Sequence, residues 1–567
     1  MKTVHTYRPF FLIFLMMISP IVLRAQLQVP GKPLGHYSRM KASNVIYLLP
    51  PLDPLEIEAR VQGGSDHYLK SYEFAIERPL SLIPESHGGW IEEEHFRIWR
   101  VHLISPGARS LGVIFDRFTL HEDVKVMLYD PHLEHVRGAY SALNNKPSGI
   151  LAIGHIPGEE VIIELQVPGH LDHYGELSIG SVSHAFLDAG GRGSQSACSG
   201  EFGCSQPCEI DVNCVEGADW QLAKRSVVRI NTPTQYCTGV LLNNTAYDGD
   251  PLLLTAKHCI EKNSDAASTV FDFNYESPSC YGGDGSLDMS ISGAKLLAVG
   301  DSIDFSLVRL SVEPPGSFDA YYAGWDLENR QSRLTTTIHH PEGDVKKISS
   351  DEQVPSSPTS PDDIPPDFKE FLYYSFWWIK EWDSGITEAG SSGAPLFNAE
   401  NQVIGILSWG YTVSCGDSIG YDPGHERIIY GKAGIINDHF TKIGVAWDHN
   451  EEAALSLEPW LDPAGSGVSA IGGYHPGAVT PLPQTPGRKF RVYPNPAGAS
   501  LYITGEPGQT GMVVYNLYGL SGALQRSGKG LMPGPVQIGT GAIDPGIYLL
   551  QIISGSRSEA HKVVIVH

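Results

Sequence analysis

The chain contains three short segments that decide its fold and its chemistry: Leu254-Thr255-Ala256-Lys257-His258-Cys259, Asp304-Phe305-Ser306-Leu307-Val308 and Gly390-Ser391-Ser392-Gly393-Ala394-Pro395. A histidine follows an apolar strand pattern, an aspartate opens the next apolar run, and a serine lies in a glycine-rich turn. A serine hydroxyl becomes a strong nucleophile when a histidine takes its proton and a carboxylate orients that histidine. The order His258, Asp304, Ser392 therefore predicts a catalytic triad.

The turn around Ser392 also predicts a site that stabilises negative charge. Gly390 has no side chain to block the bend before Ser392, so the backbone N–H groups of Gly390 and Ser392 can converge on a developing oxyanion. We therefore expect these two residues to form the oxyanion hole. The alternative is a β-rich domain in which three common residue types occur in this order by coincidence.

The flanking sequence resembles the lysyl endopeptidase branch of the chymotrypsin-like peptidases, from about Cys208 to Asp462. The resemblance is carried by Cys208-Glu209-Ile210-Asp211-Val212-Asn213-Cys214, Cys237-Thr238-Gly239, Val240-Leu241-Leu242-Asn243-Asn244-Thr245, Ala323-Gly324-Trp325-Asp326, Ile338-His339-His340-Pro341, Gly385-Ile386-Thr387-Glu388 and Trp460-Leu461-Asp462-Pro463. It implies two six-stranded antiparallel β-barrels with the triad in the cleft between them. It also implies a serine endopeptidase that cleaves proteins or peptides through an acyl-enzyme, without a metal or cofactor.

All eight cysteines lie between Cys198 and Cys415. Disulfides are expected in an exported protein, but the sequence alone allows many pairings. The resemblance implies the pairs Cys208–Cys415, Cys214–Cys280 and Cys237–Cys259. Cys198 and Cys204 remain and are paired by elimination.

The pocket for the substrate side chain departs from the pattern of the branch. Where the branch places an aspartate shortly before Tyr-Gly-Arg to receive lysine, this chain reads Ile428-Ile429-Tyr430-Gly431-Lys432. We therefore expect an apolar or unselective pocket that includes Thr387 and Ile428. Glu426 or Asp422 could instead supply the charge from a shifted loop.

Two further positions bear on substrate binding and activation. Ser408-Trp409-Gly410 resembles the trypsin-type strand whose backbone pairs with an extended substrate. Ser391 stands where trypsin-like zymogens place an aspartate that pairs with a new N-terminal amine. A neutral hydroxyl cannot anchor an ammonium group in that way, so removal of a pro-segment is expected to unblock the cleft instead of ordering it.

The first 25 residues predict a secretory signal. The basic residues Lys2 and Arg8 precede an apolar run over residues 10–18. The small residue Ala25 is a suitable position for cleavage of the signal. No later stretch approaches the ~20 apolar residues of a membrane helix, so we expect no stable span in the mature form.

Residues 26–190 show alternating strand patterns separated by turns, which predict a β-sandwich. The patterns include residues 96–104, 111–115, 124–129 and 160–165. The likeness of this region to the pro-region of the lysyl branch implies an inhibitory, folding-assisting propeptide, cut near Gly190–Ser194. A carbohydrate- or protein-binding module retained in the mature enzyme is the alternative. The peptidase domain is then expected over residues 191–473.

A proline-rich linker over residues 474–489 precedes a C-terminal β module over residues 490–567. The module resembles a type IX secretion sorting domain, because Tyr493-Pro494-Asn495-Pro496 opens it and Lys562 precedes a terminal apolar strand. The resemblance implies recognition by the secretion machinery, passage through the periplasm and outer membrane of a Gram-negative bacterium, and a secreted or surface location.

Composition excludes other classes of function. The formal charge is 40 − 64 = −24, and no basic patch suggests nucleic-acid binding. His339-His340 could suggest a metal site with Glu342 or Asp344, but adjacent side chains on a strand diverge, which favours a structural role. We therefore expect an all-β, monomeric protein with a trypsin-like double barrel between two β-sandwiches. The competing hypothesis is a surface-displayed, protein-binding or adhesin-like pseudopeptidase.

Overall fold

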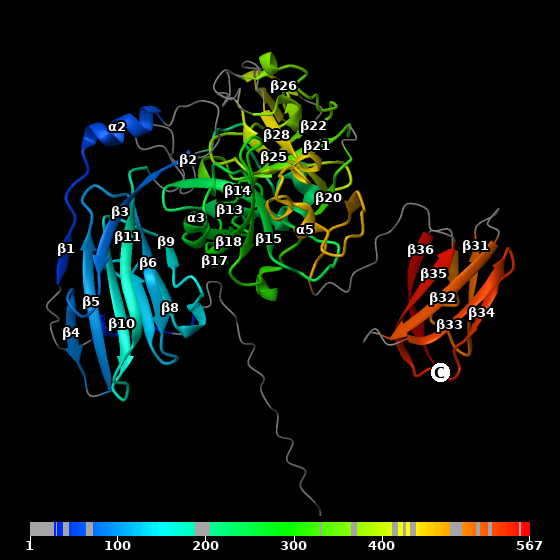
Figure 1. Ribbon diagram of the computed structural model, residues 1–567, viewed down its shortest axis with the longest axis horizontal. Coiled ribbons are helices and arrows are strands. Elements are labelled where there is room, and N and C mark those ends of the chain that lie inside the picture. The colour runs from blue at the N-terminus through cyan, green and yellow to red at the C-terminus, as the bar shows by residue number, and fades with distance from the viewer. Residues whose placement is uncertain are drawn as a thin grey trace, which may run out of the picture. The chain divides into compact units, whose positions relative to one another are not determined.

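The chain is built mainly from β-strands, which confirms the predicted all-β class (Figure 1). The computed structural model describes residues 28–29, 31–37, 45–63, 72–93, 95–187, 205–328, 332–364, 371–410, 418–422, 427–430, 438–476, 490–505, 511–519, 524–554 and 557–566. Two compact units divide the chain, Met1–Pro476 and Gly477–His567. Among the described residues, no helix is long and apolar enough to cross a membrane.

The N-terminal region is a sandwich of two sheets, as its alternating sequence predicts. The six-stranded sheet contains β1 (Ile46–Leu48), β4 (Gly89–Glu92), β5 (Phe96–Ile104), β7 (Lys125–Tyr129), β8 (Val136–Tyr140) and β10 (Glu160–Pro168). The four-stranded sheet contains β3 (Ala75–Leu82), β6 (Ser110–Leu120), β9 (Leu151–Pro157) and β11 (Gly175–Ala185). Alternate residues of both sheets fill one core, among them Trp99, Phe115, Leu128, Ile163 and Val182.

Two short helices, α1 (Leu34–Tyr37) and α2 (Pro54–Gly63), belong to this region, and a short strand joins it to the next sheet. Strand β2 (Tyr72–Glu73) pairs antiparallel with the start of β14 (Gln235–Leu242), beside which it is drawn in Figure 1. Strand β3 follows directly, so one stretch of chain belongs to both the sandwich and the sheet that follows it.

The first sheet of the central region is antiparallel and packs around its own apolar core. Its strands are β13 (Val227–Asn231), β14, β15 (Leu252–Thr255), β16 (Val270–Phe273), β17 (Ser290–Ser292), β18 (Ala294–Gly300) and β19 (Phe305–Leu310). Helix α3 (Asn263–Ala267) lies between β15 and β16 in the chain. The core includes Val228, Leu241, Leu253, Phe271 and Val308. Two predicted disulfides, Cys214–Cys280 and Cys237–Cys259, are confirmed.

The second sheet of the central region is nine-stranded. It contains β12 (Ile210–Asp211), β20 (Gly324–Asp326), β21 (Thr335–His339), β22 (Lys347–Asp351), β23 (Phe376–Ile379), β24 (Pro395–Phe397), β25 (Gln402–Trp409), β28 (Asp438–Lys442) and β29 (Ala470–Ile471). Helices α4 (Ile443–Ala446) and α5 (Glu458–Leu461) follow β28. One core joins both sheets, since Val240, Leu254 and Leu307 of the first pack with Ile338, Phe397 and Ile406 of the second. Two sheets were expected from the resemblance, as two six-stranded barrels, and two sheets are present. Each of them contains more than six strands.

A separate hairpin of β26 (Ser418–Asp422) and β27 (Arg427–Tyr430) lies between β25 and β28 in the chain. It contains Asp422 and Ile428, whose side chains are outside the described part of the structure.

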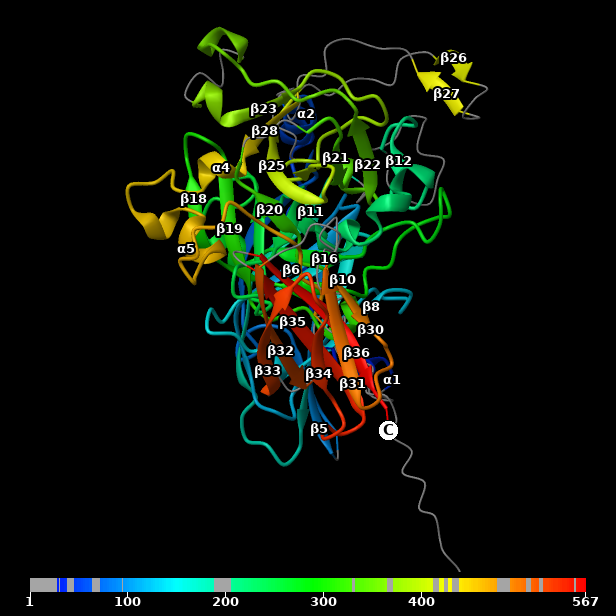
Figure 2. The ribbon, with the colours of Figure 1, turned by 90° about the vertical axis from the view of Figure 1, so that its right-hand side faces the viewer.

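The C-terminal unit is a small β-sandwich by itself, as predicted (Figure 2). One sheet contains β30 (Phe490–Tyr493), β31 (Ser500–Gly505) and β34 (Val536–Gly539). The other contains β32 (Gly511–Gly519), β33 (Leu524–Met532), β35 (Gly546–Ser554) and β36 (Arg557–Ile565). Leu501, Ile503, Val513, Leu517 and Val563 lie in its core.

Candidate active site

Strand register brings the histidine and the aspartate together. Thr255 at the end of β15 pairs with Ser306 near the start of β19, so the residues just beyond these two ends are neighbours. His258 follows β15, and Asp304 immediately precedes β19. Ser392 comes from the turn before β24, in the second sheet. Residues from both sheets therefore meet at one place, as the sequence predicts.

The three side chains form one hydrogen-bonded line. The Nε2 atom of His258 lies 2.6 Å from Oγ of Ser392, and its Nδ1 atom lies 2.9 Å from Oδ2 of Asp304. The His258 side chain is 15% exposed, whereas Ser392 is fully buried. A base within hydrogen-bond reach of a hydroxyl, itself oriented by a third group, is the geometry that activates a nucleophile.

The carboxylate of Asp304 is buried and held on several sides. It accepts hydrogen bonds from the His258 backbone N–H, at 3.1 Å, and from the hydroxyl of Ser408. Asp304 has a positive φ of 54°, a conformation that aspartate tolerates better than most residues. These contacts fix the proton of His258 on Nδ1, which leaves Nε2 as the acceptor that faces Ser392.

The turn before Ser392 requires glycine and presents two backbone donors. Gly390 has a φ of 95°, and a Cβ atom there would lie 2.6 Å from the carbonyl oxygen of His340. The Gly390 carbonyl accepts from Oγ1 of Thr238 at 2.9 Å, which turns that peptide group away from the nucleophile. Within the described part of the chain, the N–H groups of Gly390 and Ser392 make no hydrogen bond. They are therefore available to a ligand oxygen.

The Cys237–Cys259 disulfide links the loop of His258 to the strand that contacts the Ser392 turn. Cys259 follows His258 directly, and Thr238, which follows Cys237, donates its N–H to the Ser392 carbonyl at 2.8 Å. The disulfide therefore ties the histidine loop to the strand that contacts the serine turn.

Lys257, beside His258, points away from the serine. Its ammonium group lies 3.0 Å from Asp301 and 3.5 Å from Glu261. The Lys257 side chain is partly exposed and paired with these two carboxylates, which explains why a long basic side chain fits next to His258.

One buried carboxylate near the site was missed by the sequence interpretation. Asp438 opens β28, whose next residue, His439, pairs with Trp409 of β25. The carboxylate accepts from Thr387 Oγ1 at 2.6 Å and from Trp382 Nε1 at 2.7 Å. A side chain at Gly410 would collide with it. Asp438 therefore lies between the Ser408–Gly410 strand edge and the segment that leads to Ser392.

The sequence predicts an apolar or unselective pocket at Ile428, and it offers Glu426 or Asp422 as the alternative source of a charge. The long segment between β25 and β28 contains its own hairpin. A Tyr-Gly-Lys in this segment resembles the Tyr-Gly-Arg that follows the specificity aspartate in the lysyl endopeptidase branch. Asp438 could have been recognised from the strand pattern Asp438-His439-Phe440-Thr441-Lys442. This strand comes shortly before the helices that end the central region, so it is the last long strand of the second sheet. Glu426, Cys415, Cys198 and Cys204 lie outside the described residues, so the Cys208–Cys415 and Cys198–Cys204 predictions remain predictions.

The two adjacent histidines do not form a shared site. His339 bonds Ser391 and Ser349 through its ring nitrogens, whereas Nδ1 of His340 bonds the carbonyl of Asp344 at 2.9 Å. Both are fully buried and their rings have different partners. Each ring therefore has hydrogen bonds of its own, and the structural role expected for the pair stays a prediction.

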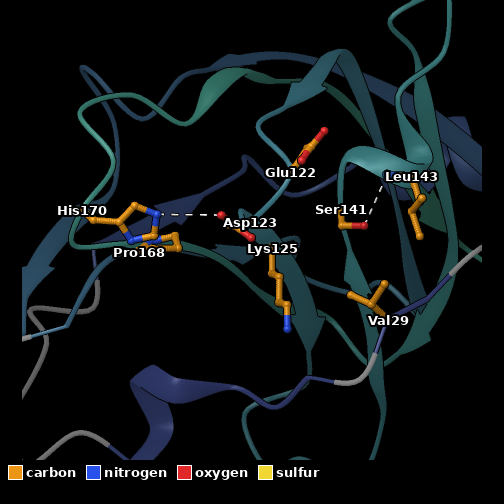
Figure 3. Close-up of a pocket in the computed structure, with 8 residues that line it drawn as sticks. All are labelled: Val29, Glu122, Asp123, Lys125, Ser141, Leu143, Pro168 and His170. Carbon is orange, nitrogen blue, oxygen red and sulfur yellow. Dashed lines mark hydrogen bonds and ion pairs between the residues drawn. The ribbon is translucent and has the colours of Figure 1, made fainter.

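A hollow of about 450 Å³ lies on the N-terminal sandwich (Figure 3). Its lining includes Glu122, Asp123, Lys125 and His170, with Asp123 3.8 Å from His170. Among the described residues that line the hollow, Ser141 carries a hydroxyl, but it caps a short helical turn by accepting from the Leu143 N–H. None of these lining residues is therefore an activated nucleophile.

Comparisons with known proteins agree with both resemblances. Residues 202–423 match the family described as "Lysyl endopeptidase, C-terminal domain", and residues 491–566 match "Secretion system C-terminal sorting domain". A protein of Pseudomonas aeruginosa named "Lysyl endopeptidase" is 29% identical over 259 residues, which cover 42% of this chain and 52% of that protein. The chain thus spans about half the length of the curated relative it matches.

Solved peptidase structures are also similar, at low identity. A Glu endopeptidase is 14% identical with a TM-score of 0.23, over 39% of this chain and 85% of that chain. Kallikrein-related peptidase 10 is 15% identical with a TM-score of 0.25, over 41% of this chain and 93% of its own.

Proposed function

We propose that this chain is a secreted serine endopeptidase whose nucleophile is Ser392. The observation that carries the proposal is the hydrogen-bonded line from Asp304 through His258 to Ser392, beside two unused backbone donors. The similarity of residues 202–423 to a lysyl endopeptidase domain supports it.

In the proposed mechanism, Ser392 Oγ attacks the carbonyl carbon of the scissile peptide bond while His258 Nε2 takes its proton. The N–H groups of Gly390 and Ser392 bind the negative oxygen of the tetrahedral intermediate. His258 then gives the proton to the leaving amine, and an acyl-enzyme on Ser392 remains. Water, activated by the same histidine, releases the product acid. The Asp304 carboxylate stabilises the imidazolium.

The test compares wild-type protein with a Ser392→Ala variant on casein, after expression of the full-length gene. The substitution removes one oxygen atom from a buried position, so the variant should fold. Cleavage by the wild type and its loss in the variant are expected. If the wild type shows no more cleavage than the Ser392→Ala variant, the proposal fails, and absence of cleavage by both proteins would favour a binding protein without peptidase activity.

We also propose that Asp438 selects a basic side chain before the scissile bond. A buried carboxylate between the substrate-binding strand and Thr387 can pair with an ammonium or guanidinium group. The name of the Pseudomonas aeruginosa relative agrees with such a preference. This proposal replaces the apolar pocket expected at Ile428.

The N-terminal region is proposed to keep the enzyme latent. Its β2 strand occupies the edge of β14 at Gln235 and Tyr236, and the Gln235 side chain donates to the His258 carbonyl at 2.9 Å. A segment on this edge therefore lies beside the loop of His258, where it can hinder access of a substrate to the triad. Removal of residues up to about 190 would free the edge.

The C-terminal sandwich is proposed to direct export through the type IX machinery to the medium or the cell surface. The match of residues 491–566 to a sorting domain supports this proposal. Deletion of the chain after Lys489 should retain the protein in the periplasm, with its peptidase domain intact. Normal extracellular amounts of the deletion variant would refute it.

A further inference from the structure

The side chain of Ser391 points into the second sheet, away from the catalytic hydroxyl next to it. Its Oγ atom lies 2.8 Å from Nδ1 of His339, at the end of β21. On the other side of the ring, Nε2 lies 3.2 Å from Oγ of Ser349, in β22. All three residues are fully buried.

The donors and acceptors of this cluster have a definite order. Ser349 donates its hydroxyl proton to the Ile386 carbonyl at 2.6 Å, so its oxygen accepts from His339 Nε2–H. Glu209, 3.7 Å from Nε2, favours a proton on that nitrogen. Nδ1 of His339 then accepts the hydroxyl proton of Ser391, whose oxygen accepts from the Glu388 N–H at 3.2 Å.

Fixing Ser391 fixes the two amides that flank it. The Ser391 N–H donates to the Glu388 carbonyl at 3.1 Å, and its own carbonyl accepts from the Ala394 N–H at 2.9 Å. The peptide group before Gly390 is held by a hydrogen bond from the Glu342 N–H to the Ala389 carbonyl. The orientation of the Gly390 and Ser392 N–H groups thus depends on the side chain of Ser391 staying in place.

We infer that His339 is a positioning residue that orders the oxyanion hole through Ser391. A side-chain hydrogen bond inside the folded domain holds the turn, so a free N-terminal amine is not required to form it. This inference rests on the proposed function, because it assigns a role in the reaction of Ser392. It extends that proposal to a residue that touches neither the substrate nor the triad.

The test uses two substitutions that separate the ring nitrogens. Asparagine at position 339 keeps a polar atom near the place of Nδ1, whereas glutamine places its amide near Nε2. We expect His339→Gln to lower kcat roughly 10- to 100-fold with KM changed less than about threefold, since misplaced oxyanion donors act on the transition state. His339→Asn should recover most of kcat.

A second readout separates positioning from general loss of structure. A peptide boronate forms a tetrahedral adduct at the serine and uses the oxyanion hole, whereas the corresponding peptide amide does not. His339→Gln should weaken binding of the boronate and leave binding of the amide unchanged. The matched control is His340→Asn, a neighbouring buried histidine that keeps its bond to Asp344 and should retain wild-type kcat.

The outcomes also separate this inference from the proposed function. The enzymes are purified from cells that express the full-length gene, and wild type is compared with Ser392→Ala in the same assay. Active wild type with an equally active His339→Gln variant would overturn only the role of His339. If His339→Gln is not recovered, Ser391→Ala provides the test, and it must show the same fall in kcat and in boronate binding. Unchanged values in Ser391→Ala would overturn the inference.

Discussion

The aromatic rings of Phe74 and Tyr236 stack with their centroids 4.1 Å apart and their planes 9° from parallel. Phe74 belongs to the N-terminal region, and Tyr236 lies in β14, next to the disulfide that braces His258. The backbone N–H groups of Phe74 and Ala75 both donate to the Thr234 carbonyl, at 3.0 and 3.2 Å. This contact is the structural basis of the latency proposed above.

Substitution of Phe74 by alanine should weaken latency. The change removes a fully buried ring and its stacking, with a cost of about 3 kcal/mol. We expect full-length Phe74→Ala protein to develop peptidase activity faster than wild type. The measurement is the lag before cleavage of a peptide substrate. Phe96→Ala, at a ring 40% exposed on the same sandwich, is the matched control, and equal lags for both variants and wild type would contradict the latency proposal.

Lys146 should make the contact between the sandwich and the peptidase depend on pH. The Lys146 Nζ atom lies 3.1 Å from Ser292 Oγ, and burial lowers the pKa of Lys146 to about 7. When the sandwich contacts the peptidase domain (the docked state), Lys146 is therefore neutral above pH 7. When the two are apart (the undocked state), Lys146 keeps its proton up to its ordinary pKa of 10.5. Stability of the docked state should rise between pH 7 and 10.5, by up to about 1.4 kcal/mol per pH unit.

The comparison of Lys146→Met with wild type isolates this effect. Thermal unfolding of both full-length proteins is followed from pH 6 to 10. The advantage of the variant should be greatest below pH 7 and decrease as the pH rises. A difference that does not change with pH would show that Lys146 keeps its proton when docked.

Asp438→Asn should change which residue precedes the cleaved bond. Loss of the negative charge removes the partner of a basic side chain, so kcat/KM for lysine and arginine substrates should fall roughly 100-fold or more, while that for leucine substrates changes little. Cleavage-site profiling on a peptide library measures this shift. Glu388 is the matched control, since this buried carboxylate binds Gln206, and Glu388→Gln should keep the basic preference. An unchanged profile for Asp438→Asn would assign Asp438 a purely structural role.

The Cys237–Cys259 disulfide should contribute to stability and to the alignment of His258. It closes a loop with a sequence separation of 22, for which chain entropy predicts about 3 kcal/mol. The double variant Cys237→Ala, Cys259→Ala should unfold at lower temperature and show reduced kcat. Cys214→Ala, Cys280→Ala is the control, because this pair lies away from the triad and should lower stability without a comparable change in kcat. Equal kcat values in both double variants would contradict the bracing role.

The proximity of the three residues of the proposed triad could be predicted because each of them follows or opens a recognisable element. His258 follows the apolar run of β15 and Asp304 precedes that of β19, so antiparallel pairing alone places them together. Both described disulfides also agreed with the resemblance. The order of strands in the two sheets was not contained in these patterns.

Asp438 and His339 were harder to recognise because their roles depend on distant partners. Asp438 acquires its position from the pairing of β28 with β25, across a long intervening segment. The partner of His339, Ser391, is 52 positions away in the sequence, and the pairing of β21 with β24 brings them within hydrogen-bond distance. Long-range register of this kind carries no local sequence signal.

Labelling with a fluorophosphonate is the most direct test of Ser392 as the activated nucleophile. Such reagents react with a serine only when a neighbouring base activates it. We predict a single adduct on the peptide that contains Ser392 of the processed enzyme, complete loss of protein cleavage on labelling, and labelling slowed at least about 1000-fold in His258→Ala. Cleavage that persists in fully labelled protein, or an adduct on another serine at equal rate, would contradict it.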